Sequence, residues 1–290
     1  MLYKYFKINE HSVSNLILNE LYCQNYKAFN DPFECWFSLR EGIPNPEIEP
    51  ERFEQICTAW GYPKEHMDSD LEDYNLYMDE LESYQPDIRA FLETVKISCF
   101  SQENDNLLMW SHYADGLRGF CVEFDEELIL SNEVDKEPSL ISVLYTDKPP
   151  VVDKMLYSLG KDQIWYHEMA IHEEPNSTYV PAYKQALSEA EKLLNDLYTK
   201  TVATKPIQWK YELESRLVFS TNNNNNNNNN DGEFFKYPSE AIKGIIFGEK
   251  MNPKAKETLI QIVEAKNLLI TKRIARRDNE DYKIKFEQVN

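Results

Sequence analysis

Glycine is scarce in this chain, and the position of two glycines constrains the fold more than any other feature. Only eight of the 290 residues are glycines, and Gly116 and Gly119 both lie in the segment MWSHYADGLRGFCVEF (109–124). The first part of this segment has a helical composition, whereas GFCVEF alternates as a strand does. Because glycine adopts left-handed conformations without steric cost, it readily ends a helix. The segment therefore predicts a tight reversal from a helix into a strand.

Strand and helix patterns alternate along the whole chain. Strands are predicted at 2–8, 21–25, 95–100, 119–124, 141–146, 205–220, 241–248, 267–275 and 282–289. This order predicts an α+β fold with a mixed, mostly antiparallel sheet. We expect a single domain, 1–290, with helical insertions at about 50–94 and 150–201. The nine consecutive asparagines predict a disordered loop at 221–232.

Charge and composition exclude several classes of partner. The 31 basic and 50 acidic residues give a net charge of −19, which opposes non-specific binding of nucleic acid and leaves only a local basic groove for a nucleic-acid substrate. The chain has no apolar run long enough to span a bilayer and no signal-peptide core, so we expect a cytoplasmic protein with no membrane partner. Five scattered cysteines and five histidines without metal-ligand spacing favour reduced thiols and no bound metal.

The segment WKYELESRLVF (209–219) is the first candidate for chemistry. On a strand, Lys210, Glu212, Glu214 and Arg216 would share one face. Two neighbouring carboxylates raise the proton affinity of one of them unless a cation compensates. A solvated, charged strand face or a helix with a Glu212–Arg216 pair would give the same pattern, and both interpretations stay open.

The 109–124 segment is the second candidate. His112 could act as a general base, or it could stabilise the end of a helix through the helix dipole. Arg118 lies between two glycines. Its guanidinium group could bind a phosphate or carboxylate of a ligand, or it could pair with an acidic side chain on the surface. Tyr113 could stack on a ligand or belong to the core.

The turn FNDPFE (29–34) is the third candidate. Asp31 and Glu34 could hold Mg²⁺, but two carboxylates are a weak signal for this metal. Asn30 and Asp31 readily hydrogen-bond to nearby backbone. We therefore favour a structural turn that orders the wall of a site.

Five motifs taken together resemble a large bacterial family of unknown function. They are YKYF (3–6), FNDPFE (29–34), CFS (99–101), MWSHYADGLRGFCVEF (109–124) and WKYELESR (209–216). The resemblance runs from Tyr3 to about Gly248, and the family itself implies no activity.

The order of elements also resembles the ADP-ribosyltransferase superfamily. That resemblance implies that Glu214 acts on the nicotinamide ribose of NAD, that Glu212 orients the acceptor, and that Ser101 stands for a serine of the middle strand. Lys4 stands where the superfamily usually has Arg or His. The expected catalytic residues are Glu214, Glu212 and His112, and the expected ligand contacts are Lys4, Tyr5, Ser101, Tyr113, Arg118 and Arg216.

The function expected from this resemblance is NAD-dependent ADP-ribosyl transfer or NAD cleavage in an intracellular toxin or phage-defence effector. NAD would be the substrate, no metal would be needed, and the macromolecular acceptor is not identified. One alternative is a non-catalytic sensor that grips a nucleotide or small anion with Lys4, Arg118 and Arg216. Another is a Mg²⁺-dependent nuclease that uses Asp31, Glu34, Glu212 and Glu214.

Overall fold

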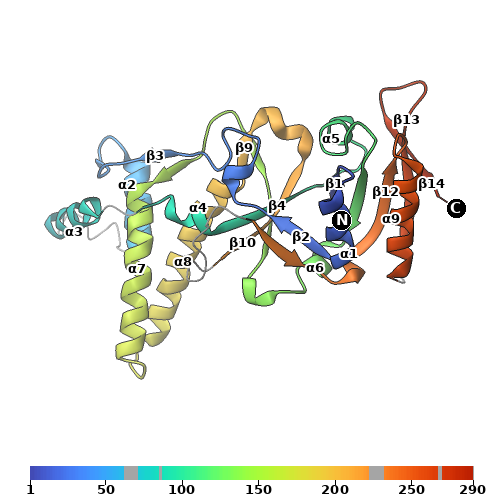
Figure 1. The fold of residues 1–290 in the computed structure, drawn as a ribbon. Coiled ribbons are helices and arrows are strands. Elements are labelled where there is room, and N and C mark those ends of the chain that lie inside the picture. Colours follow the sequence, from blue (N-terminus) through green and yellow to red (C-terminus); the bar gives the residue numbers. More distant parts are fainter. Residues whose placement is uncertain (62–70, 85–86, 222–231, 267–269, 290) are drawn as a thin grey trace. The chain divides into compact units, whose positions relative to one another are not determined.

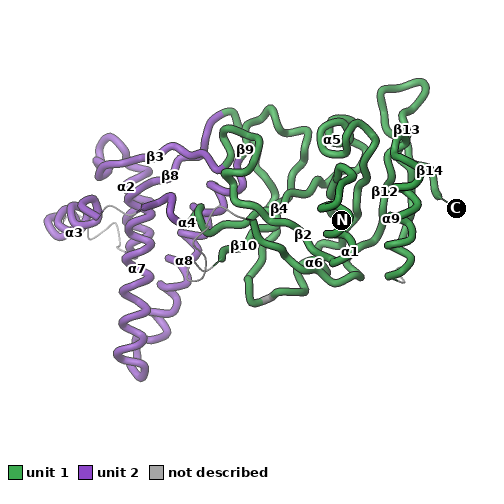
Figure 2. The backbone as a smooth tube through the Cα atoms, in the orientation of Figure 1, with its two compact units in different colours: residues 1–34, 91–147, 205–290 green, residues 35–90, 148–204 purple. Residues whose placement is uncertain are grey.

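The chain divides into two compact units (Figure 2). In the computed structural model, the described residues are 1–61, 71–84, 87–221, 232–266 and 270–289. Unit 1 contains residues 1–34, 91–147 and 205–290, and unit 2 contains 35–90 and 148–204. The two segments predicted as helical insertions lie largely in unit 2, and the single domain stays a prediction. Residues 222–231 of the predicted disordered loop lie outside the described residues.

Unit 1 is built on a large sheet. Its strands are β1 (Leu2–Phe6), β4 (Val95–Ser101), β5 (Phe120–Phe124), β6 (Ser139–Ser142), β10 (Glu214–Ser220), β12 (Ile242–Gly248), β13 (Thr271–Arg277) and β14 (Ile284–Gln288). Their order is β14-β13-β12-β5-β1-β4-β10-β6 (Figure 1). The β12–β13 pair is parallel, and the other neighbours in this sheet are antiparallel. The predicted α+β class with a mixed, mostly antiparallel sheet is confirmed.

Shorter elements surround this sheet. The helices are α1 (Glu10–Leu18), α4 (Ala90–Thr94), α5 (Leu107–His112), α6 (Glu126–Ile129) and α9 (Pro253–Ala265). Two small sheets pair β2 (Glu20–Cys23) with β11 (Glu233–Lys236), and β7 (Leu144–Thr146) with β9 (Thr204–Pro206). The single strand predicted at 141–146 is wrong, because Val143 interrupts it: its amide donates to the carbonyl of Glu214 (2.9 Å) and separates β6 from β7.

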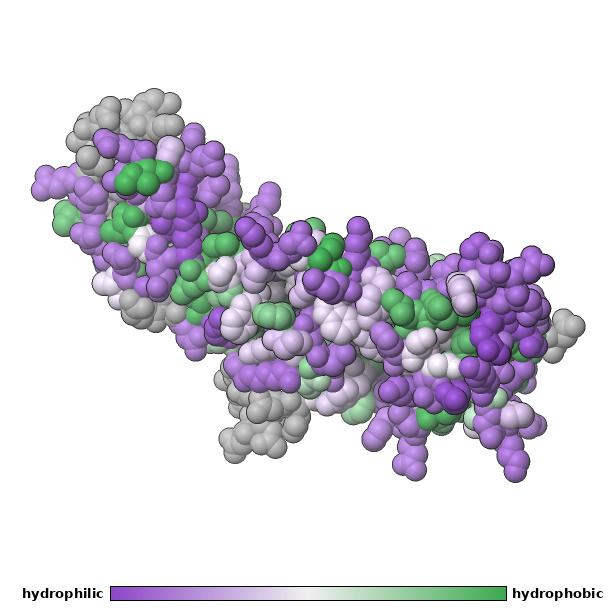
Figure 3. All heavy atoms as spheres, turned by 90° about the horizontal axis from the view of Figure 1, so that it is seen from above, coloured by the Kyte–Doolittle hydropathy of each residue, from purple (hydrophilic) through white to green (hydrophobic). Residues whose placement is uncertain are grey.

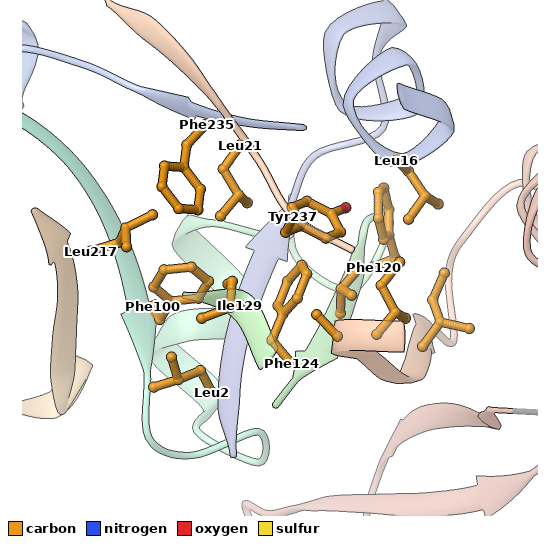
Figure 4. Packing of buried hydrophobic residues seen from close by; sticks show 14 of the residues in the cluster. Leu2, Leu16, Leu21, Phe100, Phe120, Phe124, Ile129, Leu217, Phe235 and Tyr237 are labelled. Atoms are coloured by element: carbon orange, nitrogen blue, oxygen red, sulfur yellow. The ribbon is translucent and has the colours of Figure 1, made fainter. Parts of the chain in front are cut away.

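Strict alternation along the strands creates two cores. On one face, Phe100, Phe124 and Leu217 pack with Leu16 of α1 in the largest cluster (Figure 4), which also takes in Leu259 of α9. On the other face, strand residues pack under α5 and the turn that follows it. That second cluster comprises Tyr5, Met109, Trp110, Ala114, Leu117, Cys121, Ile246, Ala275 and Ile284. Both faces of the sheet are therefore covered by apolar packing.

The predicted helix-to-strand reversal is confirmed at 115–119. Asp115, Gly116 and Leu117 have φ angles of 49°, 60° and 69°, three left-handed residues in succession. A Cβ on Gly119 would lie 2.0 Å from the carbonyl oxygen of Phe6, at the end of β1. Gly116 therefore supplies conformation, whereas Gly119 supplies space for the neighbouring strand.

Unit 2 has its own core. It contains α2 (Pro50–Trp60), α3 (Leu71–Ser83), α7 (Lys154–Glu173) and α8 (Val180–Val202), with β3 (Ser38–Arg40) paired in parallel to β8 (Val151–Asp153). Its buried apolar cluster comprises Phe53, Ile56, Cys57, Tyr74, Met78, Leu81, Met155 and Leu159. Arg52 and Asp153 form a buried ion pair, with Nε 2.6 Å from Oδ2.

The surface agrees with the acidic, polar composition. Figure 3 shows hydrophilic residues over most of the visible face and hydrophobic residues in small separate groups. Among the described residues, no helix is both long enough and apolar enough to span a membrane.

Candidate functional site

The sheet of unit 1 is interrupted between β1 and β4. These strands pair at Tyr3 and Ser101, whereas β1 pairs with β5, and β4 with β10, along their whole lengths. A cavity of about 340 Å³ lies at this interruption. Residues of both sheet faces line it, Lys4 and Phe100 from one face and Tyr5 and Cys99 from the other. We call this cavity the first pocket.

Lys4 occupies the gap between the two strands. Its Nζ donates to the carbonyl oxygen of Cys99 (2.8 Å) and to Oγ of Ser98 (2.9 Å). The ammonium group thus satisfies a β4 carbonyl that a neighbouring strand would otherwise satisfy. Burial lowers the pKa of Lys4, and the nearby groups Cys99, Cys23 and Glu214 oppose this shift.

Two buried carboxylates face the first pocket and share one cation. Nζ of Lys205 lies 2.6 Å from Oε2 of Glu212 and 3.0 Å from Oε2 of Glu214. The Tyr113 hydroxyl donates to the other oxygen of Glu212. All three charged side chains are almost completely buried.

Glu214 has a second cationic partner, Arg216. Arg216 is completely buried, and its Nε lies 2.8 Å from Oε1 of Glu214. Its Nη1 lies 2.5 Å from Oε1 of Glu34. The network therefore alternates in sign, from Glu212 through Lys205, Glu214 and Arg216 to Glu34.

The surroundings push the two carboxyl pKa values in opposite directions. Burial would raise the pKa of Glu214, but the charges of Arg216 and Lys205 outweigh it and hold the pKa at about 2. Burial raises the pKa of Glu212, and the charge of Lys205 offsets only part of that rise. Glu214 is therefore ionised at neutral pH, and Glu212 is the better proton acceptor of the pair.

The single strand predicted at 205–220 is wrong between residues 207 and 213. Residues Ile207–Glu212 form a 3₁₀ helix, η4, and Leu213 has a left-handed φ of 40° before β10 begins at Glu214. Side chains from distant segments hold this turn: Nδ2 of Asn106 donates to the Tyr211 carbonyl, and Oγ of Ser101 donates to the Glu212 carbonyl, both at 2.8 Å. Glu212 therefore enters the pocket from a helix rather than from the strand face that carries Glu214.

The predicted structural turn at FNDPFE is confirmed. The Phe33 amide donates to Oδ1 of Asp31 (2.9 Å), and the Glu34 amide donates to the Asp31 carbonyl (3.1 Å). Phe29 and Asn30 line the first pocket. Because Glu34 and Glu214 both bind Arg216, and Glu212 binds Lys205, three of the four carboxylates of the nuclease hypothesis already have a cationic partner.

The structure brings most of the predicted site residues together. Six of them line the first pocket, namely Lys4, Tyr5, Ser101, Tyr113, Glu212 and Glu214. Arg216 does not line the pocket. Its guanidinium contacts the carboxylate of Glu214, which does. The Ser101 hydroxyl is engaged by the Glu212 carbonyl, so this serine also positions the carboxylate.

Besides Arg216, two predicted residues lie outside the first pocket, His112 and Arg118. His112 is exposed and lines a neighbouring second pocket, where its Nδ1 is 3.2 Å from the Tyr211 hydroxyl. Arg118 is exposed, lines neither pocket, and donates to the Asp115 carbonyl (3.1 Å). The common cavity expected for Arg118 and Glu214 is therefore not formed.

Sequence reasoning missed Lys205 and the pairing of Glu34 with Arg216. Lys205 lies before the WKYE segment, and on the predicted strand its odd position would put it on the face opposite Glu212 and Glu214, so the strand pattern did not single it out. Glu34 is separated from Arg216 by most of the chain, and the recurrence of both motifs in one family was the only available signal.

Comparison with family models gave one match. A family described as a protein of unknown function (DUF2971) matches residues 109–217. The predicted resemblance to a family of unknown function is confirmed over this segment, which carries Tyr113, Glu212, Glu214 and Arg216. Comparisons with curated proteins and with solved structures gave no significant match.

Proposed function

We propose that the protein transfers ADP-ribose from NAD, or hydrolyses NAD, in the first pocket. One observation carries this proposal: two buried carboxylates, Glu212 and Glu214, face one cavity with their pKa values pushed in opposite directions. Glycosyl transfer needs such a pair, because one carboxylate must stay charged while the other accepts a proton.

Glu214 would stabilise the charge that develops on the ribose. When the bond between C1′ and the nicotinamide nitrogen breaks, nicotinamide leaves with the electron pair and positive charge accumulates on the ribose. A carboxylate fixed in a buried site stabilises this charge without reorganisation. Arg216 and Lys205 keep Glu214 ionised, and they also fix the direction in which it points.

Glu212 would receive the proton of the acceptor. As the acceptor forms its new bond to C1′, it loses a proton, and a carboxylate with a raised pKa accepts that proton efficiently near neutral pH. With water as acceptor the product is free ADP-ribose, and with a macromolecule it is an ADP-ribosylated adduct. Depletion of NAD or modification of an essential component would suit a toxin or phage-defence effector.

The test is nicotinamide release from NAD by the wild type, by Glu214→Gln and by Glu287→Gln. Glu287 in β14 forms an exposed ion pair with Arg276 in β13, so its variant is a matched control. We expect release by the wild type and by the control, and a loss of about 100-fold or more in Glu214→Gln. Thermal denaturation of each variant separates loss of chemistry from loss of folding. Equal release by Glu214→Gln and the wild type would sink the proposal.

A second candidate is a nucleotide sensor without catalysis. It is favoured by one observation: both oxygens of Glu214 already have cationic partners, Arg216 on Oε1 and Lys205 on Oε2. Such a carboxylate could serve mainly to hold two cations beside a ligand. Tight binding of NAD by the wild type without any nicotinamide release would support this candidate over the first.

A further inference from the structure

A second pocket of about 640 Å³ adjoins the first. Tyr5, Asn30 and Tyr113 line both pockets, so they form the wall between them. The remaining lining comprises Phe6, Lys7, Asn9, His11, Ser12, Asn15, His112, Trp209 and Tyr211. Nothing in the proposed NAD chemistry uses this cavity.

The charge of this lining is opposite to that of the whole protein. The chain has a net charge of −19, yet the described residues around the second pocket include no aspartate or glutamate and do include Lys7, His11 and His112. Asn9 caps α1, and His11 and Ser12 lie in its first turn, so the N-terminus of this helix is at the pocket; Glu10 in the same turn reduces its positive potential but does not line the pocket. The pocket therefore suits an anion, and phosphate in particular.

Aromatic rings form the other half of the lining. Trp209 and Tyr211 project from η4 with ring centroids 6.1 Å apart, and His112 lies 5.8 Å from Tyr211. Nζ of Lys205 lies 4.8 Å from the centroid of Trp209, so this ring is also next to the carboxylate network. Rings beside cationic and amide side chains are what nucleobases stack on in single-stranded nucleic acids.

One short helix joins this surface to the carboxylates. Trp209 and Tyr211 line the second pocket, and Glu212, the last residue of the same η4, lines the first. Tyr113 lines both pockets and donates to Glu212. An acceptor in the second pocket would thus approach the site from the side of Glu212.

We propose that the second pocket binds the acceptor, and that the acceptor is a nucleotide, either free or within a single-stranded nucleic acid. The transfer step rests on the proposed function, whereas the binding step does not. In that transfer, a nitrogen of the base attacks C1′ of the NAD ribose and forms the new N–C1′ bond. The bond from C1′ to nicotinamide breaks, its electron pair leaves with nicotinamide, and the proton of the base nitrogen passes to Glu212.

The test measures binding without NAD. Fluorescently labelled single strands of eight nucleotides, DNA and RNA, are titrated with the wild type, Trp209→Ala and Lys7→Glu, and mononucleotides serve as competitors. Trp165→Ala and Lys236→Glu are matched controls, since both side chains are exposed and lie outside the pocket. We expect the two pocket variants to bind about 10-fold or more weakly and the controls to bind as the wild type does.

The competition identifies the source of the base. Displacement by micromolar mononucleotide supports a free nucleotide, and a requirement for the strand supports nucleic acid. Absence of binding, or equal binding by the wild type and both pocket variants, Trp209→Ala and Lys7→Glu, overturns the inference. Nicotinamide release without base binding overturns this inference alone. Base binding without nicotinamide release overturns the proposed function together with the transfer step, and leaves the binding step standing.

Discussion

Arg216 is a completely buried cation whose burial depends on two carboxylates. Glu214 and Glu34 each lie within 2.8 Å of its guanidinium. A buried charge that loses its partner is strongly destabilising, so the three residues depend on one another. Arg216 was predicted to contact the ligand, but its contacts make it the residue that orients Glu214 and keeps it ionised.

The pKa of Glu214 predicts a specific dependence of stability on pH. Its folded-state value of about 2 lies below the ordinary value of 4.5, so its contribution is complete above pH 4.5 and is lost as the pH falls towards 2. At about 1.4 kcal/mol per pKa unit, the contribution at pH 7 is about 3 kcal/mol. Urea denaturation should therefore show Glu214→Gln less stable than the wild type at pH 7, with the difference shrinking below pH 4.5.

The control for this prediction is Glu287→Gln, which alters an exposed pair with Arg276. Exposed pairs contribute roughly 0–1 kcal/mol, so this variant should follow the wild type at each pH. A difference between wild type and Glu214→Gln that stays constant down to pH 2 would show that Glu214 is not held ionised by its neighbours.

At the scale of elements, the turn after α5 packs against the end of β1 and fixes the position of that strand end. The left-handed residues 115–117 bring Gly119 against Phe6, and Leu117 packs against Gly248, where a Cβ would lie 2.2 Å from the Leu117 carbonyl oxygen. Because Lys4 and Tyr5 precede Phe6 on the same strand, this contact also sets one wall of the first pocket.

Gly119→Ala tests this contact. The added Cβ has no space beside the Phe6 carbonyl, and overpacking of this kind costs about 1–3 kcal/mol or more. We expect lower stability in urea denaturation and weaker NAD binding, since β1 must move. Gly42→Ala is the control: its φ is +82° but nothing lies within 4 Å, so it should cost only about 1–2 kcal/mol of backbone strain and leave NAD binding intact.

The same scale shows what the sequence could predict. Local patterns predicted β1, β4, β5, β12 and the 115–119 reversal, because alternation and glycine act within a few residues. They failed at 209–213, where alternating charges imitate a strand. The hydrogen bonds from Ser101 and Asn106 that hold η4 come from more than 100 residues away, and no local pattern records them.

For the site residues too, local sequence patterns identified some members, and contacts between distant segments determined the rest. Glu212 and Glu214 were found because like charges at close spacing demand compensation. Of the two cations expected to compensate on the strand face, Arg216 does pair with Glu214. Lys210 is exposed on η4 instead, and Lys205 takes its place. Only the three-dimensional path of the chain decides which of two nearby lysines reaches the carboxylates.

At the scale of the whole molecule, each unit has a separate apolar core. The unit 2 core contains fully buried residues from α2, α3 and α7, among them Ile56, Met78 and Met155. Units with separate apolar cores often unfold locally as separate cooperative units. The two segments of unit 2, 35–90 and 148–204, would then exchange amide hydrogens together although they are distant in the sequence.

Met155→Ala tests this independence. Removal of a fully buried methionine costs about 2–5 kcal/mol, and the loss should fall on unit 2. Hydrogen exchange should accelerate in 35–90 and 148–204 and stay unchanged in β1, β4 and β5. Equal acceleration in both units would instead support the single cooperative domain predicted from the sequence.

The central position of β1 has a consequence for protein synthesis. Leu2 pairs with Phe124, so β1 leaves the ribosome more than 120 residues before the end of its partner β5. At a synthesis rate of 5–20 residues per second, this delay is roughly 6–25 s. During that time Leu2, Tyr5 and Phe6 are exposed on a nascent chain. A chaperone or a temporary contact that shields these side chains during synthesis would favour correct folding of this topology.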